Sequence, residues 1–426
     1  MPLPDRKIQP GIKPMDRLFV LDAEKITLDN GIPAYLVNGG NQEVFKLDLI
    51  FNSGSADGDF PLIAFHTNKM LVEGTPNMTS AEISEKLDYY GATIKSYCDK
   101  DISGVTVYSL NKYADEMIDL FARLINESAF PEVELITLNS KQKQLFLVNQ
   151  RKVRHVAREN FFSLIYGKDK PYGQINELED FDDIELNAIK NYYREKYRSD
   201  NCFAIISGKV DDALISTINS KVGKILEPGF REQPKEYLEA SLEPTDQLIE
   251  RKDVLQSAIR IGRPLFNKLH PDYIPMKFVS TLLGGYFGSR PMSNILEDKG
   301  YTYGIGSNLV SLEHSGYFFI ATEVGADVRK AAVEEIYAEI ERLIIEAVSD
   351  KEIDLVKNYM TGSFMHNIDG PFALAEAYKN VLLFGLDQEY FDRMIDEIHA
   401  MTAGKVQELA AKYLKKEDLF ELIVGK

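Results

Sequence analysis

The chain has 426 residues, of which 44% are hydrophobic and 27% charged, and its formal net charge is −17. A single hydrophobic core rarely serves more than about 250–300 residues, so this length predicts two domains. The acidic balance argues against binding to nucleic acid or to an anionic membrane surface.

The chain begins with a polar segment, MPLPDRKIQP, that proline interrupts, and no apolar run along the sequence approaches about 18 residues. These features predict neither a signal peptide nor a membrane span. The two cysteines, Cys98 and Cys202, provide no disulfide framework and favour a reduced compartment. We therefore expect a soluble, cytoplasmic protein.

In the first half, residues 94–110 are rich in β-favouring side chains broken by Ser103-Gly104, which predicts two strands and a turn. A helix should follow, because its apolar residues fall on one stripe. A second helix over 189–197 precedes a strand at 203–209. The stripe of the first helix consists of Ala114, Met117, Ile118, Phe121, Leu124 and Ile125.

The second half repeats this order. Residues 302–324 predict a strand pair broken by Ser315-Gly316, and a helix over 406–413 precedes the last strand, 420–426. Between them lies an apolar stripe of Ile336, Ile340, Leu343, Ile344 and Ala347.

Three short matches recur in the same order and at nearly constant spacing, which indicates an internal duplication. They are FAIISGK at 203–209 with FELIVGK at 420–426, LIYG at 164–167 with LLFG at 382–385, and GAT at 91–93 with GYT at 300–302.

Residues 227–245 are rich in Pro, Glu and Gln, and we predict a linker at 229–243 between domains at 1–228 and 244–426. Hairpins rather than strict βαβ alternation predict α+β domains, each a mainly antiparallel sheet with helices packed on it.

The stretch FHTNKMLVEGT at 65–75 resembles the zinc helix of the inverzincin peptidases of the pitrilysin, insulinase and mitochondrial-processing-peptidase type. The resemblance continues along most of the chain and implies two homologous domains that form a clam-shell. It is carried by FNSGSADG at 51–58, LDYYGAT at 87–93, KDKPYG at 168–173, YRSDN at 197–201, LGG at 283–285, GSR at 288–290 and KGYTYG at 299–304.

In that family the helix carries H-x-x-E-H, whose two His hold zinc while the Glu polarises the attacking water. Aligned on the trailing Met-Leu-x-x-Gly-Thr, the first His falls on Phe65, the Glu on Asn68 and the second His on Lys69. The family's third ligand, a Glu on a later helix, corresponds to Asn149 or Gln150 on a helix predicted over 141–158. The resemblance therefore implies a degenerate, non-catalytic member from which zinc is absent.

Two side chains of this helix leave alternatives open. His66 lies about 100° around the helix from Phe65, and we interpret it as an ordinary histidine at the helix surface or core edge. Lys69 either pairs with Glu73 at i,i+4 or places its ammonium in the cation position, held by neighbouring acids.

In the second half, the family's Arg and Tyr that contact substrate carbonyls correspond to Leu296 and Tyr303. The Arg is thus lost, and Arg290 is a poor substitute because it lies about 240° away in helix phase. Tyr303 is either a substrate contact or a half-buried strand tyrosine. Three glycines nearby are further candidate substrate-binding positions, although a helix-packing turn explains them better than a nucleotide cradle, because no P-loop Lys-Ser/Thr follows. They are Gly284, Gly285 and Gly288.

The leading functional hypothesis is a non-catalytic subunit that pairs with an active H-x-x-E-H sister chain, or with a second copy of itself, to form a chamber for peptide substrates. The alternatives are a peptide-binding scaffold without a protease partner and an active zinc peptidase whose ligands have moved.

Overall fold

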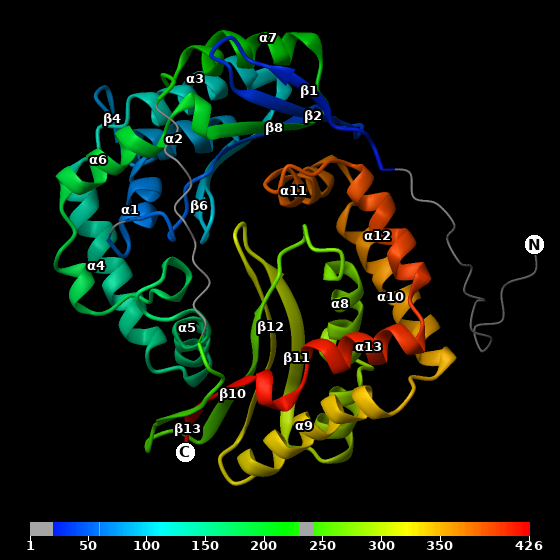
Figure 1. The fold of residues 1–426 in the computed structure, drawn as a ribbon. Coiled ribbons are helices and arrows are strands. Elements are labelled where there is room, and N and C mark those ends of the chain that lie inside the picture. Colours follow the sequence, from blue (N-terminus) through cyan, green and yellow to red (C-terminus); the bar gives the residue numbers. More distant parts are fainter. Residues whose placement is uncertain (1–19, 59, 230–241) are drawn as a thin grey trace, which may run out of the picture.

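The protein has two domains, each combining a sheet with packed helices, in a computed structural model that describes residues 20–58, 60–229 and 242–426 (Figure 1). The predicted α+β class is confirmed, because both sheets are mainly antiparallel and lie against helices. Most of the predicted linker, 229–243, lies outside the described residues, as does the N-terminal segment. Within the described ranges, no helix is both long and apolar enough to cross a membrane.

A six-stranded sheet forms the centre of the first domain, in the order β1-β2-β8-β3-β7-β6. Neighbouring strands are antiparallel except β2 and β8, which are parallel. The strands are β1 (Glu24–Thr27), β2 (Pro33–Asn38), β3 (Val44–Phe51), β6 (Thr93–Cys98), β7 (Ser103–Leu110) and β8 (Cys202–Gly208); β4 (Gly74–Thr75) and β5 (Met78–Thr79) form a separate ribbon. The helices of this half are α1 (Ile63–Met70), α2 (Ser80–Tyr90), α3 (Ala114–Asn126), α4 (Glu132–Asn149), α5 (Val153–Tyr166), α6 (Leu186–Lys196) and α7 (Asp212–Lys221).

Five strands form the sheet of the second domain, in the order β11-β12-β10-β13-β9. They are β9 (Asp246–Glu250), β10 (Gln256–Leu265), β11 (Thr302–Ser311), β12 (Gly316–Gly325) and β13 (Phe420–Gly425). The helices of this half are α8 (Tyr273–Ser280), α9 (Arg329–Ile345), α10 (Asp350–Asn367), α11 (Pro371–Leu382), α12 (Glu389–Ala400) and α13 (Ala403–Tyr413).

The two sheets share one topology, in which β9, β13, β10, β12 and β11 take the places of β2, β8, β3, β7 and β6. The directions agree as well, since β2/β8 and β9/β13 are parallel and the other corresponding pairs are antiparallel. The repeated sequences at 203–209 and 420–426 therefore lie on corresponding strands, β8 and β13. Gly91 and Gly300, which precede β6 and β11, have positive φ values of 60° and 64°.

One helix from each half of the chain packs against the sheet of the other half. Helix α5 packs on β10 and β13, while α11 packs on β8 and β2. Figure 1 shows α5 beside the second sheet and α11 beside the strands of the first. The packing thus crosses the sequence boundary predicted between 1–228 and 244–426, and the two domains close on each other as a clam-shell held at these helices.

Strand β3 is buried on both faces as a result. The side chains of a strand point alternately to opposite faces. The odd-numbered side chains from Phe45 to Phe51 join the core under the first domain's helices. Lys46, Asp48 and Ile50 face the second domain instead.

The first turn lies just before the predicted Ser103-Gly104 pair, and the second includes Ser315 of its predicted pair. Residues 99–102 and 312–315 make the turns, whereas Ser103-Gly104 begins β7 and Gly316 begins β12. These glycines serve close packing: a Cβ on Gly104 would lie 2.4 Å from the Tyr97 hydroxyl, and one on Gly316 would lie 2.1 Å from the Phe266 carbonyl oxygen.

The predicted apolar stripes hold for α3, all of whose six stripe residues are buried. In α9 the stripe is shorter than expected. Ile336, Ile340 and Leu343 are buried, but Ile344 is half-buried and Ala347 is exposed beyond the end of the helix.

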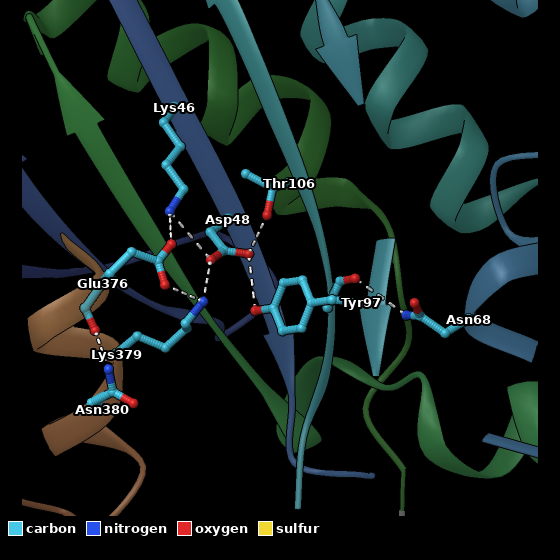
Figure 2. A network of polar contacts seen from close by, with 9 residues as sticks. Lys46, Asp48, Asn68, Tyr97, Thr106, Glu376, Lys379 and Asn380 are labelled. Atoms are coloured by element: carbon cyan, nitrogen blue, oxygen red, sulfur yellow. Dashed lines mark hydrogen bonds and ion pairs between the residues drawn. The ribbon is translucent and has the colours of Figure 1, made fainter. Parts of the chain in front are cut away.

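A buried ion-pair network joins the two domains where α11 meets β3 (Figure 2). The Lys46 and Asp48 side chains are 2% and 1% exposed. The Lys379 ammonium lies 3.4 Å from the Asp48 carboxylate and 2.6 Å from that of Glu376, which also accepts a hydrogen bond from Lys46. Burial alone would raise the pKa of Glu376, but the two lysines outweigh burial and hold that pKa below its usual range.

Two hydroxyls complete the hydrogen bonding of Asp48. Tyr97 on β6 and Thr106 on β7 both donate to its Oδ1, at 3.1 and 2.9 Å. Tyr97 reaches Asp48 across Gly104. The buried carboxylate is thus satisfied from three strands and one helix.

We expect Asp48→Asn to destabilise the chain by about 3–5 kcal/mol, because it leaves two buried lysines facing one acid. Urea unfolding at neutral pH measures this loss. Glu408→Gln, which breaks the exposed Lys405–Glu408 pair, is the matched control and should change stability by less than about 1 kcal/mol.

The companion variant Glu376→Gln should be less stable than wild type at neutral pH. That difference should disappear as the pH falls through the Glu376 pKa, because a group with a lowered pKa loses its contribution on protonation. Equal losses for Asp48→Asn and Glu408→Gln would show that the network does not hold the domains together.

Candidate functional site

Helix α1 (Ile63–Met70) carries the predicted site positions and begins from a strained residue. Leu62 has a φ of 69°, a left-handed conformation that costs a non-glycine residue about 1–2 kcal/mol. Its carbonyl oxygen accepts the backbone N–H of His66, and the His66 Nδ1 lies 3.1 Å from it. The strain is thus tied to the first turn of the helix.

Asn68, in the position of the catalytic Glu, is built into the core. It is fully buried, and its Nδ2 donates to the Tyr197 hydroxyl at 3.2 Å and to the Gly104 carbonyl at 3.3 Å. Tyr197 is itself buried, and burial raises its pKa well above the usual range, so it is a neutral phenol. Asn68 therefore faces the core and not a cavity, and its amide links α1 to β7 and to Tyr197, which follows α6.

Lys69, in the position of the second His, binds a backbone carbonyl. Its ammonium donates to the Ser96 carbonyl of β6 at 2.6 Å and lies 5.8 Å from the centre of the Phe65 ring. Glu73 instead accepts a hydrogen bond from Ser80. Neither expected arrangement is observed, because the cation is held by a carbonyl dipole rather than by Glu73 or a group of acids. Lys69 thus fastens α1 to β6, the edge strand of the first sheet.

Phe65 and the predicted third-ligand positions meet at one cavity of about 300 Å³. Phe65, Asn149 and Gln150, which align with zinc ligands of the family, all line it, whereas Asn68 and Lys69 do not. The Asn149 Oδ1 accepts a hydrogen bond from Lys152 at 3.0 Å. The helix predicted over 141–158 is in fact two, since α4 ends at Asn149 and α5 begins at Val153.

His66 is a core histidine rather than one at the helix surface. It is fully buried, and burial lowers the pKa of its imidazole, which is therefore neutral at pH 7. It does not line the cavity beside Phe65.

Other side chains around this cavity were not predicted, and their spacing gave no signal. They include Cys98 and His155. Burial raises the pKa of the Cys98 thiol to about 12, so no thiolate is available as a nucleophile or ligand. In the described ranges, no three His, Cys, Asp or Glu side chains are grouped so that they could hold a metal. Zinc sites need three protein ligands, and these residues do not fit one.

The second-half candidates are not brought together. Tyr303 is 95% exposed and lies at a separate cavity of about 630 Å³, which Leu296 does not line. Arg290 makes a bidentate ion pair with Glu352, at 2.7 and 2.9 Å, and so cannot replace the lost Arg.

The glycine turn packs against β11. A Cβ on Gly284 would lie 2.5 Å from the Ser307 backbone nitrogen, and one on Gly285 would lie 3.0 Å from Thr281. Gly288 has the Tyr286 ring 3.1 Å from its Cβ position. None of the three lines the Tyr303 cavity, so their positions support the packing interpretation.

Sequence reasoning also missed Arg260, which lines the Tyr303 cavity. A signal was present, because an arginine between Ile259 and Ile261 interrupts an apolar stretch of the kind that forms a buried strand.

Two models of one protein family match the chain. The model described as "Insulinase (Peptidase family M16)" matches residues 40–174, and the one described as "Peptidase M16 inactive domain" matches residues 183–360. Together they include the α1 positions, the cavity beside Phe65 and the second-half candidates.

Similar proteins are found along nearly the whole chain. An "Uncharacterized zinc protease YmxG" of Bacillus subtilis is 22% identical, over 94% of this chain and 98% of the relative. A "Non-peptidase homolog YmxG" of Helicobacter pylori is 20% identical, over 84% of this chain and 83% of the relative. The two descriptions differ on activity, so the side chains at the site must decide that question for each chain.

The fold is shared with a solved structure described as a peptidase M16 inactive domain from Pseudomonas fluorescens. Its TM-score is 0.86 at 21% identity, with coverage of 95% of this chain and 98% of that one. At this identity, the likeness supports the fold alone.

We expect Lys69→Met to destabilise the chain by about 1–3 kcal/mol, because the Ser96 carbonyl loses its charged donor. Lys95→Met is the matched control, because Lys95 is an exposed lysine next to Ser96 on β6, and this change should be nearly neutral. Urea unfolding compares the two. Equal stabilities would show that Lys69 does not fasten α1 to β6.

We expect the purified chain to hold no stoichiometric zinc, as emission spectrometry of the dialysed protein would measure. The triple variant Phe65→His, Asn68→Glu and Lys69→His should bind zinc weakly, because it restores two imidazoles and no third ligand. Adding Asn149→Glu, from the wall that also holds Phe65, should strengthen binding at least about tenfold.

Asn149→Glu alone is the control for that series and should leave the chain without zinc. About one zinc per wild-type chain, lost with peptide hydrolysis on chelation, would overturn the assignment of these positions.

Proposed function

The chain belongs to the M16 peptidase family, and because its zinc-helix positions supply no metal ligand, we propose that it acts as a non-catalytic subunit beside an active sister chain. The sister would carry an intact H-x-x-E-H motif, and the pair would enclose a chamber that degrades or processes peptides. A homodimer is the variant of this proposal in which the sister is a second copy.

The observation that carries the proposal is the reuse of the former catalytic positions. Asn68 is bonded to Tyr197 and Gly104, and Lys69 is bonded to Ser96. These hydrogen bonds join α1 to β6, β7 and Tyr197, while the Asn68 Oδ1 accepts no hydrogen bond within the described residues. The catalytic helix has become a structural element in a fold that is otherwise kept, as a partner subunit requires.

Helix α4 offers a surface for the sister chain. Only Leu135 of this helix is buried, while a stripe of Val133, Ile136 and Leu147 is 39–73% exposed. Exposed apolar side chains on one helix face favour an interaction surface, and here Ser140 and Gln144 lie between Ile136 and Leu147 on that face. The other side of α4 lines the cavity beside Phe65, so a chain seated on α4 would lie next to the former zinc site.

The alternatives make different demands. A peptide-binding scaffold needs no partner, and the exposed α4 stripe is then unexplained. A peptidase with relocated ligands needs three ligands in one place, a grouping that the described residues do not provide. We further propose that the protein is cytoplasmic and that the matching topology of its halves reflects an internal duplication.

Purification of the tagged full-length chain from native extract, followed by mass spectrometry, should recover one H-x-x-E-H chain in near-equal amount. Co-expression should yield a stable complex with an interface of about 1,600 Å² or more that hydrolyses peptides. Activity should disappear when the sister's catalytic Glu is replaced by Gln.

The α4 surface is tested in the same complex. Ile136→Asp together with Leu147→Asp should weaken association by at least about 30-fold, as loss of interface anchors does. Lys141→Glu changes an exposed charge elsewhere on this helix and serves as the control. A strictly monomeric chain without a partner in native extract would favour the scaffold alternative.

A further inference from the structure

The cavity beside Tyr303 opens on the face of the second sheet that α5 only partly covers. Its volume is about 630 Å³, and β10, β11, β12 and the start of α5 form its walls. Figure 1 shows α5 beside β10, with β12 and β11 farther across the sheet. Arg154, Arg260 and Glu323 are its charged lining residues.

Arg260 is buried without an acidic partner. It is 8% exposed, and its guanidinium carbon lies 4.7 Å from the centre of the Phe319 ring and 5.9 Å from that of Phe161. No ion pair or hydrogen bond of its side chain occurs within the described part of the chain. By contrast, Arg263 on the same strand lies 3.0 Å from Asp418. Burial lowers the Arg260 pKa to about 10, so the group stays charged at neutral pH.

The corresponding place in the first domain shows what is missing. Strand pairing puts Arg260 where the first sheet has Asp48. Asp48 pairs with Ile205, the third residue of FAIISGK at 203–209. Arg260 pairs with Leu422, the third residue of the repeated FELIVGK at 420–426. Asp48 is met there by Lys379 of α11.

The helices that cover the two sheets, α5 and α11, end within the repeated LIYG at 164–167 and LLFG at 382–385. Phe161 and Lys379 each lie three residues before that repeat, so Phe161 of α5 corresponds to Lys379 of α11. The ion pair of the first domain thus becomes an arginine facing a phenyl ring in the second. Among the described residues, the one acid of α5 that acts on Arg260 is Glu159, which makes no ion pair with it and lies 3.0 Å from Arg158 instead.

The same comparison explains why a cavity exists. Asp48 is hydrogen-bonded by Thr106 and Tyr97, which fill the space beside it. Strand register places Ala321 and Asn308 at these two positions of the second sheet, and both line the cavity. Ala321 and Asn308 are smaller than Thr106 and Tyr97 and leave volume next to the unpaired charge. Phe319, by contrast, takes the place of Gly104 and packs on the guanidinium.

The other charges around the opening do not neutralise Arg260. Glu323 lies 3.8 Å from Arg154, whose side chain is 81% exposed. Buried charges in proteins are normally paired, and an isolated one is costly. A guanidinium offers a planar fork of donors that fits a carboxylate in two parallel hydrogen bonds.

We propose that this cavity binds a carboxylate of a short peptide segment, held by Arg260 and Arg154. Neutral polar and apolar groups, among them Gln256, Asn308 and Ala157, line the remaining volume and suit a peptide backbone and side chains. Exposed Tyr303 stands at the opening. The inference rests on the proposed peptide-handling function and assigns it a subsite on this chain.

Fluorescence anisotropy of the full-length chain with three forms of one labelled hexapeptide tests the proposal. The first form has an internal Glu and a C-terminal amide, the second has Gln and the amide, and the third has Gln and a free C-terminal carboxylate. The first or the third should bind at least about tenfold more tightly than the second, and the preferred form identifies the source of the carboxylate.

Arg260→Met should remove this preference, and Arg260→Lys should weaken it about tenfold, because an ammonium cannot make the paired bonds. Arg154→Ala should have a smaller effect. Arg393→Met, which alters an arginine beside Glu397 on α12, should leave binding unchanged. If Arg260→Met lowers the melting temperature, the Lys and Arg154→Ala variants, checked for wild-type melting, decide the outcome.

Equal affinities for the three peptides, no binding at all, or wild-type binding by the arginine variants would overturn the proposal. Inorganic phosphate that displaces all three peptides equally would show a general anion site and would also overturn it. Recovery of the sister chain does not depend on Arg260. A complex that forms while the peptide test fails would therefore refute this inference alone.

Discussion

The exchange of α5 and α11 between the two sheets is the constraint on which the rest of the structure depends. Neither sheet can bury both faces with the helices of its own half, so each covers one face with a helix from the other. At α11 this forces polar residues of β3 into the interior, and Lys46 and Asp48 are tolerated there because Glu376 and Lys379 balance them. The arrangement of the two domains therefore contributes directly to the stability of the chain, because opening the halves would expose apolar surface and separate buried charges.

This constraint leaves α1 free to be held by its own contacts, with no metal needed to keep the two domains together. Helix α1 lies on the opposite side of the first sheet from α11, in a core of its own. Zinc, where a relative binds it, would add local stabilisation to α1, and here that contribution is supplied by Asn68 and Lys69. Asn68 and Lys69 make hydrogen bonds that hold α1 on the sheet, and the Phe65 ring lies 5.8 Å from the Lys69 ammonium.

Much of the fold could be predicted from the sequence because local patterns determine it. The α3 stripe and the repeated strands depend only on periodicity and order, and both are found as expected. The failures concern tertiary packing. Gly104 was interpreted as a turn residue, but it is small because Tyr97 passes over it. The break between α4 and α5 has no proline or glycine to mark it. Arg260 gave only a weak signal, because its burial depends on a helix from the other half of the chain.

The two interfaces made by the exchanged helices are alike in geometry and opposite in chemistry. At α11, Asp48 is fully satisfied and the space beside it is filled, so that interface holds the domains together. At α5, Arg260 occupies the same place against two phenyl rings and without an ion pair, and a cavity lies beside it. The duplicated architecture allows the two interfaces to differ in this way, because the ion-pair network at α11 is sufficient to fix the domains relative to each other. The second copy is then free to keep a buried cation that is useful only when a ligand supplies the opposite charge.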